Sequence, residues 1–242
     1  MKNSKAILKL TVLSLLIALG VVISPILRFE GMCPMAHLIN IVCSVLMGPW
    51  YSLLCATLIG IIRMLIMGIP PIALTGAIFG AFLSGVFYRL SKGKILFAVI
   101  GEIIGTGIIG AIISYPVMTF LWGKEGLSLF FYVPSFIAGT LIGGSIAFIF
   151  LRKLASGGML TEMQKKLSDQ SFEDKSGLIS TSAVIAAFGV VAFMVIKILT
   201  GIFDMSNVVW DYIAYSALAG FVIAGVIYFA VKKFKGNIEN DS

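Results

Sequence analysis

The sequence predicts an all-α membrane protein that crosses the bilayer several times. Of its 242 residues, 59% are hydrophobic and only 12% are charged, and the mean hydropathy is +1.06. A soluble domain needs a charged surface and does not have this composition. Apolar runs of roughly 20 residues recur along the chain, which is the length of a transmembrane helix. Because backbone N–H and C=O groups in lipid must be paired internally, these runs are expected to be helical.

Eight apolar spans follow one another along the chain, and the second is short. They cover residues 6–27, 35–48, 51–67, 71–90, 96–121, 132–151, 177–200 and 208–231. The only long polar stretch between spans divides the first six from the last two. We therefore expect a six-span domain over residues 1–154, a polar connector over 155–176, and an additional two-helix hairpin with a basic tail over 177–242.

The connector contains apolar residues at helical spacing. Met159, Leu160, Met163 and Leu167 recur beside two lysines. This pattern is typical of a helix that lies on the cytoplasmic surface of the membrane. A solvated connector without a packed face is an equally good interpretation.

The basic residues indicate which side of the membrane each connection faces. If the N-terminus is cytoplasmic, 14 of the 18 Lys and Arg residues lie inside, and the other four lie outside or in the outer half of the membrane. The four are Arg28, Arg63, Lys124 and Lys197. The positive-inside rule therefore places both termini in the cytoplasm. Topology explains the net charge of +7, so no nucleic-acid partner is needed. A cleaved signal peptide at the N-terminus is the less favoured alternative, because the apolar run is too long.

Small residues spaced by four mark faces on which transmembrane helices approach closely. Rows of this kind occur in the spans that contain Gly76 and Gly80, Gly101 and Gly105, and Gly139 and Gly143. Such rows usually pack within the molecule. In the first span, Ser14, Ala18 and Gly20 form a smooth surface that is also suitable for docking another membrane protein.

The motifs associated with nucleotide or catalytic chemistry are incomplete. Residues 105–110, GTGIIG, have the letters of a dinucleotide fingerprint but lie inside an apolar span, whereas that fingerprint requires a βαβ unit. No Walker A loop is present, so ATP would have to be used by a partner. The single histidine, His37, and a first aspartate at Asp169 do not allow a zinc site or an aspartyl dyad in the six-span domain. We expect no enzymatic activity, no cofactor and no metal.

A few polar side chains remain at membrane depth, where they are costly and therefore candidates for function. His37 and Asn40 are one helical turn apart at the outer end of the second span, and Arg63 is near the outer end of the third. Further candidates for substrate contact are Glu30, Glu102, Thr106, Tyr115, Trp122 and Tyr132. These groups predict an outward-facing pocket, although Glu102 lies deep, in the inner half of its span. Structural alternatives are a snorkelling arginine, an aromatic belt and a structural histidine.

Several short motifs fall in a characteristic order: His37-x-x-Asn40, then LMGPWY over residues 46–51, then Arg63, then GExxGTG over residues 101–107. In this order the chain resembles the ThiW family, substrate-binding S components of energy-coupling factor (ECF) transporters, over roughly residues 1–155. The resemblance implies a receptor for hydroxyethylthiazole, a thiamine precursor. It also implies a transmembrane T subunit and two cytoplasmic ATPase subunits as partners, and it assigns docking on the T subunit to Ser14, Ala18 and Gly20.

The additional hairpin departs from the family pattern, which ends after six helices. Alternatives to the thiazole receptor are an S component for another vitamin or small solute and a self-sufficient secondary transporter. The latter class commonly has inverted repeats and a midplane ion site, and no repeated half is visible here. Arg63 exceeds what a neutral ligand needs; it either pairs with Glu30 or indicates an anionic substrate.

Overall fold

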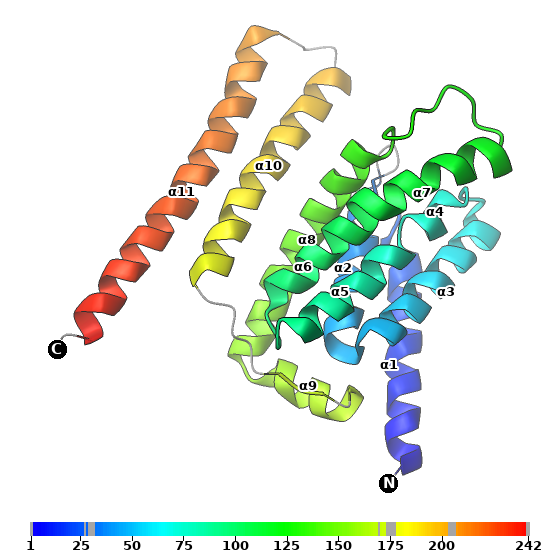
Figure 1. Ribbon diagram of the computed structural model, residues 1–242, viewed down its shortest axis with the longest axis horizontal. Coiled ribbons are helices and arrows are strands. Elements are labelled where there is room, and N and C mark those ends of the chain that lie inside the picture. Colours follow the sequence, from blue (N-terminus) through cyan, green and yellow to red (C-terminus); the bar gives the residue numbers. More distant parts are fainter. Residues whose placement is uncertain are drawn as a thin grey trace. The chain divides into compact units, whose positions relative to one another are not determined.

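The computed structural model describes residues 2–26, 28, 32–168, 170–172, 178–202 and 207–240, and the described chain is almost entirely helical (Figure 1). It divides into two compact units, residues 1–175 and 176–242. Within the described residues, six helices are long and apolar enough to cross a membrane, and two shorter apolar helices cover 34–47 and 181–194. The protein is therefore a polytopic helical membrane protein, as the sequence predicts.

The first unit contains nine α-helices and two π-helical segments within its described residues. Its helices are α1 (Lys2–Ile23), α2 (Pro34–Met47), α3 (Pro49–Met67), α4 (Ile72–Thr75), α5 (Ile78–Leu90), α6 (Ile95–Glu102), α7 (Ala111–Pro116), α8 (Val133–Ser156) and α9 (Met159–Leu167). The π-helical segments are η1 (Ile103–Gly110), which joins α6 to α7, and η2 (Val117–Leu121), which follows α7.

Helix α2 is the centre of this unit. It contacts α1, α3, α5, α6, α8 and α9, and all its residues except Met35 and Leu38 are buried. At about 1.5 Å per residue it is too short to cross a hydrocarbon core of about 30 Å. The surrounding helices, rather than lipid, cover its surface. This burial explains why a 14-residue helix is stable here.

Proline and glycine define both ends of α2 and α3. Pro34 and Pro49 occupy the first turns of the two helices, where the missing N–H group has no intrahelical partner to lose. Gly48, between the helices, has a φ of 93°, a conformation that favours glycine. The chain therefore turns sharply at Gly48, and α3 runs back along α2.

The span predicted over residues 71–90 is broken, because α4 and α5 are separate helices around Gly76 and Ala77. The span predicted over 96–121 is continuous but changes its winding twice, at η1 and η2. Glycines allow α5 to approach this span closely: a Cβ added to Gly105 would lie only 2.5 Å from the Cα of Gly80. The small residues therefore pack within the molecule at this place.

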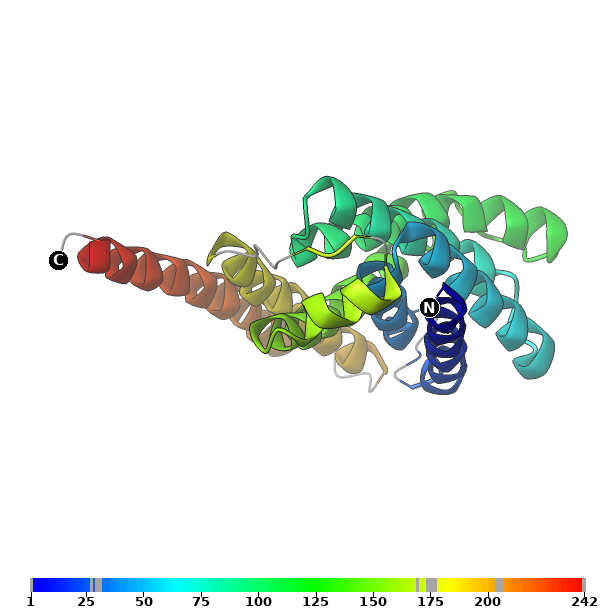
Figure 2. The same ribbon diagram turned by 90° about the horizontal axis from the view of Figure 1, so that it is seen from below.

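Helix α9 confirms a helix in the connector, but its apolar face packs on protein. Leu160, Gln164 and Leu167 are buried, and Figure 2 shows α9 crossing the end of the unit near the start of α1. Gln164 donates to the carbonyl of Val45 at 2.8 Å and to the hydroxyl of Tyr88 at 2.9 Å. It thus caps the C-terminal turn of α2, where carbonyls lack helical partners.

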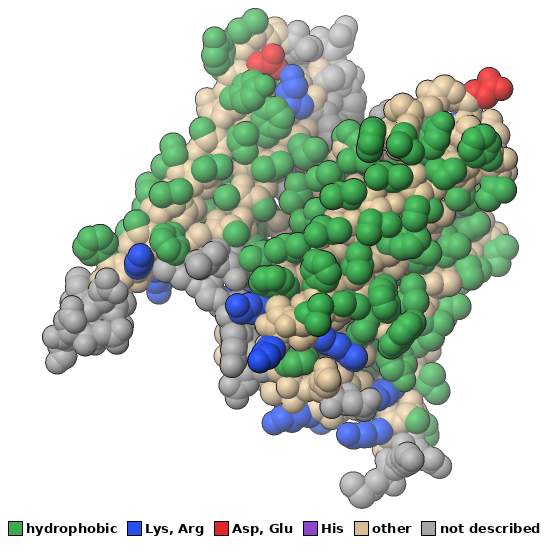
Figure 3. All heavy atoms as spheres, viewed as in Figure 1, with side chains coloured by type: hydrophobic (Ala, Val, Ile, Leu, Met, Phe, Trp, Pro, Cys, Tyr) green, Lys and Arg blue, Asp and Glu red, His purple; other side chains and the backbone are tan. Residues whose placement is uncertain are grey.

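Basic side chains gather at the end of the first unit that carries α9. Figure 3 shows Lys and Arg side chains at that end and hydrophobic side chains along the sides. On α9 itself, Lys166 is exposed and lies 2.6 Å from Glu162, which lowers the pKa of that exposed carboxyl. The distribution is that of a protein with one strongly basic membrane face.

The second unit is a helical hairpin formed by α10 (Leu178–Ile202) and α11 (Val208–Asn240). A Cβ added to Gly189 would lie 2.8 Å from the Cβ of Phe221, so the helices are in close contact at that glycine. Near the turn, Lys197 and Asp211 form an ion pair of 2.7 Å.

Candidate functional site

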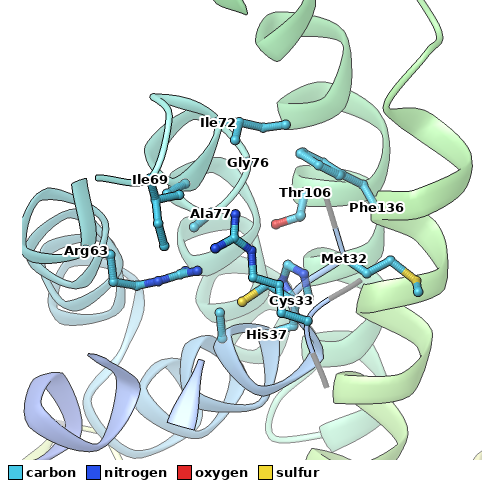
Figure 4. A pocket seen from close by; sticks show the side chains of 13 residues that line it. Met32, Cys33, His37, Arg63, Ile69, Ile72, Gly76, Ala77, Thr106 and Phe136 are labelled. Carbon is cyan, nitrogen blue, oxygen red and sulfur yellow. The ribbon is translucent and has the colours of Figure 1, made fainter. Parts of the chain in front are cut away.

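A cavity of about 50 Å³ lies between α2, α3, α4, η1 and α8. It is near the start of α2 and the end of α3, so it lies toward the end of the first unit opposite the basic one. Its walls are mostly apolar, with a few polar side chains (Figure 4). The lining residues are Arg28, Met32, Cys33, Ala36, His37, Arg63, Ile69, Ile72, Ala73, Gly76, Ala77, Thr106 and Phe136. A few polar groups set among mostly apolar walls are typical of ligand-binding sites.

Helix α2 supplies His37 and Asn40 from one turn. Since residues three apart share a helix face, both side chains point into the bundle, and they are only 5% and 2% exposed. His37 also packs against α8, because a Cβ added to Gly143 would lie 3.0 Å from the His37 Cβ. The histidine is thus held between two helices at the edge of the cavity.

Glu102 organises the polar groups behind the cavity. Its side chain is fully buried, and one oxygen, Oε1, meets three partners. Asn40 Nδ2 donates to it at 3.0 Å and the Thr106 hydroxyl donates at 3.1 Å, and His37 Nδ1 lies 2.9 Å away. The network connects α2 to the helix formed by α6 and η1. Networks of this kind hold side chains in one geometry.

Glycine makes room for this network. A Cβ added to Gly80 would lie 2.0 Å from the Thr106 hydroxyl oxygen and 2.8 Å from Oε2 of Glu102. The π-helical segment η1 begins directly after Glu102 and contains Thr106. π-Helical turns are frequent at functional sites, where they redirect side chains.

The network also orients the imidazole of His37. When Nδ1 donates to the Glu102 carboxylate, the other ring nitrogen, Nε2, is left to accept a hydrogen bond. Fixing a ring nitrogen through a buried carboxylate presents the opposite nitrogen in a single tautomer. The site can therefore offer a fixed hydrogen-bonding atom to a ligand.

Arg63 is a buried cationic side chain in the wall of the cavity. It is only 4% exposed, and its Nε has no hydrogen-bond partner. Figure 4 shows its side chain extending from α3 into the cavity. Arg28 lines the same cavity from the segment that follows α1. Two arginines therefore contribute to the wall of the cavity, which also includes His37.

The predicted site residues fall into three groups. His37, Arg63 and Thr106 line the cavity, whereas Asn40 and Glu102 lie behind it in the hydrogen-bond network. The three aromatic candidates, Tyr115, Trp122 and Tyr132, do not line it. Tyr132 instead packs on Phe136, with ring centroids 5.8 Å apart. Glu30 lies outside the described residues.

The sequence analysis included Glu102 among the candidates, while noting its depth, and it did not include four residues that line the cavity: Phe136, Met32, Cys33 and Arg28. Counting residues along a helix gives depth but not the direction in which a neighbouring helix points its side chains. Arg28 did carry a signal, because it is one of few basic residues on the sparse side of the membrane. Phe136 was indistinguishable from other aromatic residues in an apolar run.

The proposed docking residues on α1 are divided between two faces. Ser14 and Ala18 are exposed and line a shallow apolar groove together with Leu58 and Ile62 of α3. Gly20 is buried, and a Cβ added to it would lie 2.3 Å from Ile59 Cδ1. The structure therefore places Gly20 against α3 and leaves Ser14 and Ala18 on the outer surface.

No group of three or more His, Cys, Asp or Glu side chains that could hold a metal ion occurs in the part of the chain that the structure describes. The three cysteines are free thiols: Cys43 and Cys55 are buried, and Cys33 is partly exposed. The described lining residues offer hydrogen bonding, charge and aromatic contact.

Comparison with known proteins identifies the family. The family model described as "Thiamine-precursor transporter protein (ThiW)" matches residues 10–157, more than half of the chain and most of the first unit. No curated protein and no solved structure matches the chain. The resemblance inferred from the sequence motifs is confirmed: the chain belongs to the ThiW family of thiamine-precursor transporter proteins.

Proposed function

We propose that this protein is the substrate-binding S component of an ECF-type transporter and that its substrate is hydroxyethylthiazole. The observation that carries the proposal is the buried Glu102 network, which presents His37 to a small cavity within the family-matched region. Roughly 10–15 Å³ of such volume accommodates one water molecule. A cavity of about 50 Å³ therefore favours a small ligand over a large vitamin.

The cavity provides suitable partners for a substituted thiazole. Phe136 offers an aromatic surface for the ring. Because the protons of His37 Nδ1 and Thr106 are directed at Glu102, His37 Nε2 and the Thr106 oxygen can each accept a hydrogen bond from the hydroxyl group of the ligand. Asn40 and Glu102 act on the ligand through His37 and Thr106, because they lie behind the lining residues.

The binding face is assigned to the outside of the cell. Basic side chains gather at the opposite end of the first unit (Figure 3), and the positive-inside rule assigns that end to the cytoplasm. The N-terminus of α1 lies at the same end, and both termini are assigned to the cytoplasm. A ligand from outside would then enter near Cys33 and Arg28.

Energy for uptake is assigned to partner subunits. The sequence has no Walker A loop, so ATP hydrolysis requires the two cytoplasmic ATPases of the complex. The groove that contains Ser14 and Ala18 is the surface assigned to the T subunit. Small residues permit close approach of a second membrane helix there.

Ligand binding by the purified full chain tests the proposal. Hydroxyethylthiazole should bind, thiamine and larger vitamins should bind at least tenfold more weakly, and His37→Ala should abolish binding. His37→Gln, which keeps an amide for Glu102, tests whether loss of binding reflects loss of the fold. Trp122→Phe is the matched control and should bind normally, since Trp122 does not line the cavity. Unchanged affinity in folded His37→Ala protein would refute the role of this cavity.

The contact between His37 and Glu102 supports a second candidate, a proton-coupled secondary transporter. Buried ionisable pairs in membranes are typical of proton relays. In proteoliposomes without ATPase subunits, this candidate requires uptake driven by a proton gradient and abolished by an ionophore. The S-component proposal requires that no such uptake occurs.

A further inference from the structure

We propose that the cavity selects ligands with an anionic group, a carboxylate or a phosphate, and that Arg63 and Arg28 bind this group. The inference rests on the proposed function, a receptor for a substituted thiazole, and refines the preferred ligand from the neutral alcohol to a thiazole that carries an acidic substituent. It starts from Arg63, an almost fully buried cation whose Nε has no hydrogen-bond partner. Burial of an unpaired charge is costly, so such groups normally have a counter-charge.

Two arginines and no carboxylate are found among the described residues that line the cavity. Arg63 and Arg28 both line it, and the described lining residues include neither Asp nor Glu. Neither guanidinium forms an ion pair within the described chain. Two like charges at one small cavity repel each other, and an anion between them would relieve this repulsion.

Glu102 is the carboxylate of the hydrogen-bond network behind the cavity, and its Oε2 has no hydrogen-bond partner. Oε1 of Glu102 meets His37, Asn40 and Thr106, and among the described residues Glu102 forms an ion pair with His37 and with neither arginine. The dipole of α3 stabilises Arg63 to some extent, because the residue lies near the C-terminal end of that helix. A helix terminus carries only about half a unit charge, so among the described residues the two guanidinium charges exceed the compensation that the α3 dipole provides.

Guanidinium groups match oxyanions in geometry as well as charge. Their planar N–H donors bind the oxygens of a carboxylate or phosphate in pairs. Phe136 and His37 are part of the same cavity, so an aromatic ring and an attached oxyanion could be bound together. The ligand class is therefore a small aromatic ring with a short acidic substituent.

The test compares three probes on the purified full chain: hydroxyethylthiazole, its phosphate monoester and the matching thiazole acetic acid. We expect at least one anion to bind at least tenfold more tightly than the neutral alcohol. Arg63→Gln should weaken binding of that anion by on the order of 30-fold or more and weaken binding of the alcohol by a clearly smaller factor. Arg63→Lys, which keeps the charge but not the planar donors, should lie between these values.

The outcomes separate the two proposals. If the alcohol binds as tightly as both anions, or if Arg63→Gln weakens all probes equally, the anionic preference is refuted and the thiazole receptor stands. The absence of any preference would also be the result expected if Glu30 supplied the counter-charge. If none of the three probes binds to protein that elutes as a folded species, both proposals fail.

Discussion

Replacing Glu102 should separate its structural role from its charge. Glu102→Ala removes the oxygen that accepts hydrogen bonds from Asn40 and Thr106 and contacts His37. Hydrogen bonds between membrane helices are worth about 0.6 kcal/mol each when the separated groups find new partners. Buried groups that stay unsatisfied cost about 1–3 kcal/mol each. Asn40 Nδ2 keeps a hydrogen bond to the carbonyl of Ala77, whereas His37 and Thr106, which are at most 5% exposed, lose the partner of Nδ1 and of the hydroxyl. The higher cost therefore applies to two groups, and the expected loss is about 2–6 kcal/mol.

A loss of about 3 kcal/mol, within this range, corresponds to a fall in Tm of roughly 6–12 °C for a chain of this size. Glu102→Gln retains an oxygen acceptor and nearly the same volume, so its Tm should fall by less than half as much. The assay is thermal unfolding followed with a thiol-reactive fluorophore in a Cys33→Ser background. Cys43 and Cys55 are fully buried and become reactive only on unfolding. Equal Tm values for wild type and Glu102→Ala would refute the role of Glu102 as the centre of the network.

Three further predictions concern packing and docking. Gly80→Ala should cost about 1–3 kcal/mol through overpacking against Thr106 and weaken ligand binding, whereas Gly220→Ala, which meets open space, should not lower the Tm. Gln164→Ala should cost about 1–3 kcal/mol by leaving buried groups unsatisfied and should speed tryptic cleavage at α9; an unchanged digestion pattern would contradict the capping role. Ala18→Leu should keep ligand binding but prevent co-purification with the T subunit, while Ala18→Ser should preserve both; normal assembly of the leucine variant would exclude this groove as the docking surface.

The fold class followed from composition, because lipid leaves helices as the available solution for repeated apolar runs. The short second span was also predicted, over residues 35–48. In the structure the corresponding helix begins at Pro34 and is capped by Gly48. The break near Gly76 and the π-helical winding after Glu102 were not predicted. The break and the π-helical segment both depend on contacts between helices, and the periodicity of residues along one helix does not reveal such contacts.

The candidate site could also be predicted only in part from the sequence. His37 and Arg63 were recognised because ionisable groups in apolar spans are rare. The link from Glu102 to His37 spans 65 residues of sequence and depends on close packing permitted by Gly80 and Gly105. Phe136 became a candidate only when the structure placed it in the cavity wall.

Sidedness of the cavity is the central claim, and Cys33 allows a direct measurement. Cys33 lines the cavity and is partly exposed, whereas Cys43 and Cys55 are buried. In intact cells, a membrane-impermeant maleimide should label Cys33 from outside, and bound hydroxyethylthiazole should slow this labelling. Cys33→Ser protein should remain unlabelled. Labelling of Cys33 only when the reagent reaches the cytoplasmic face would contradict the receptor proposed here.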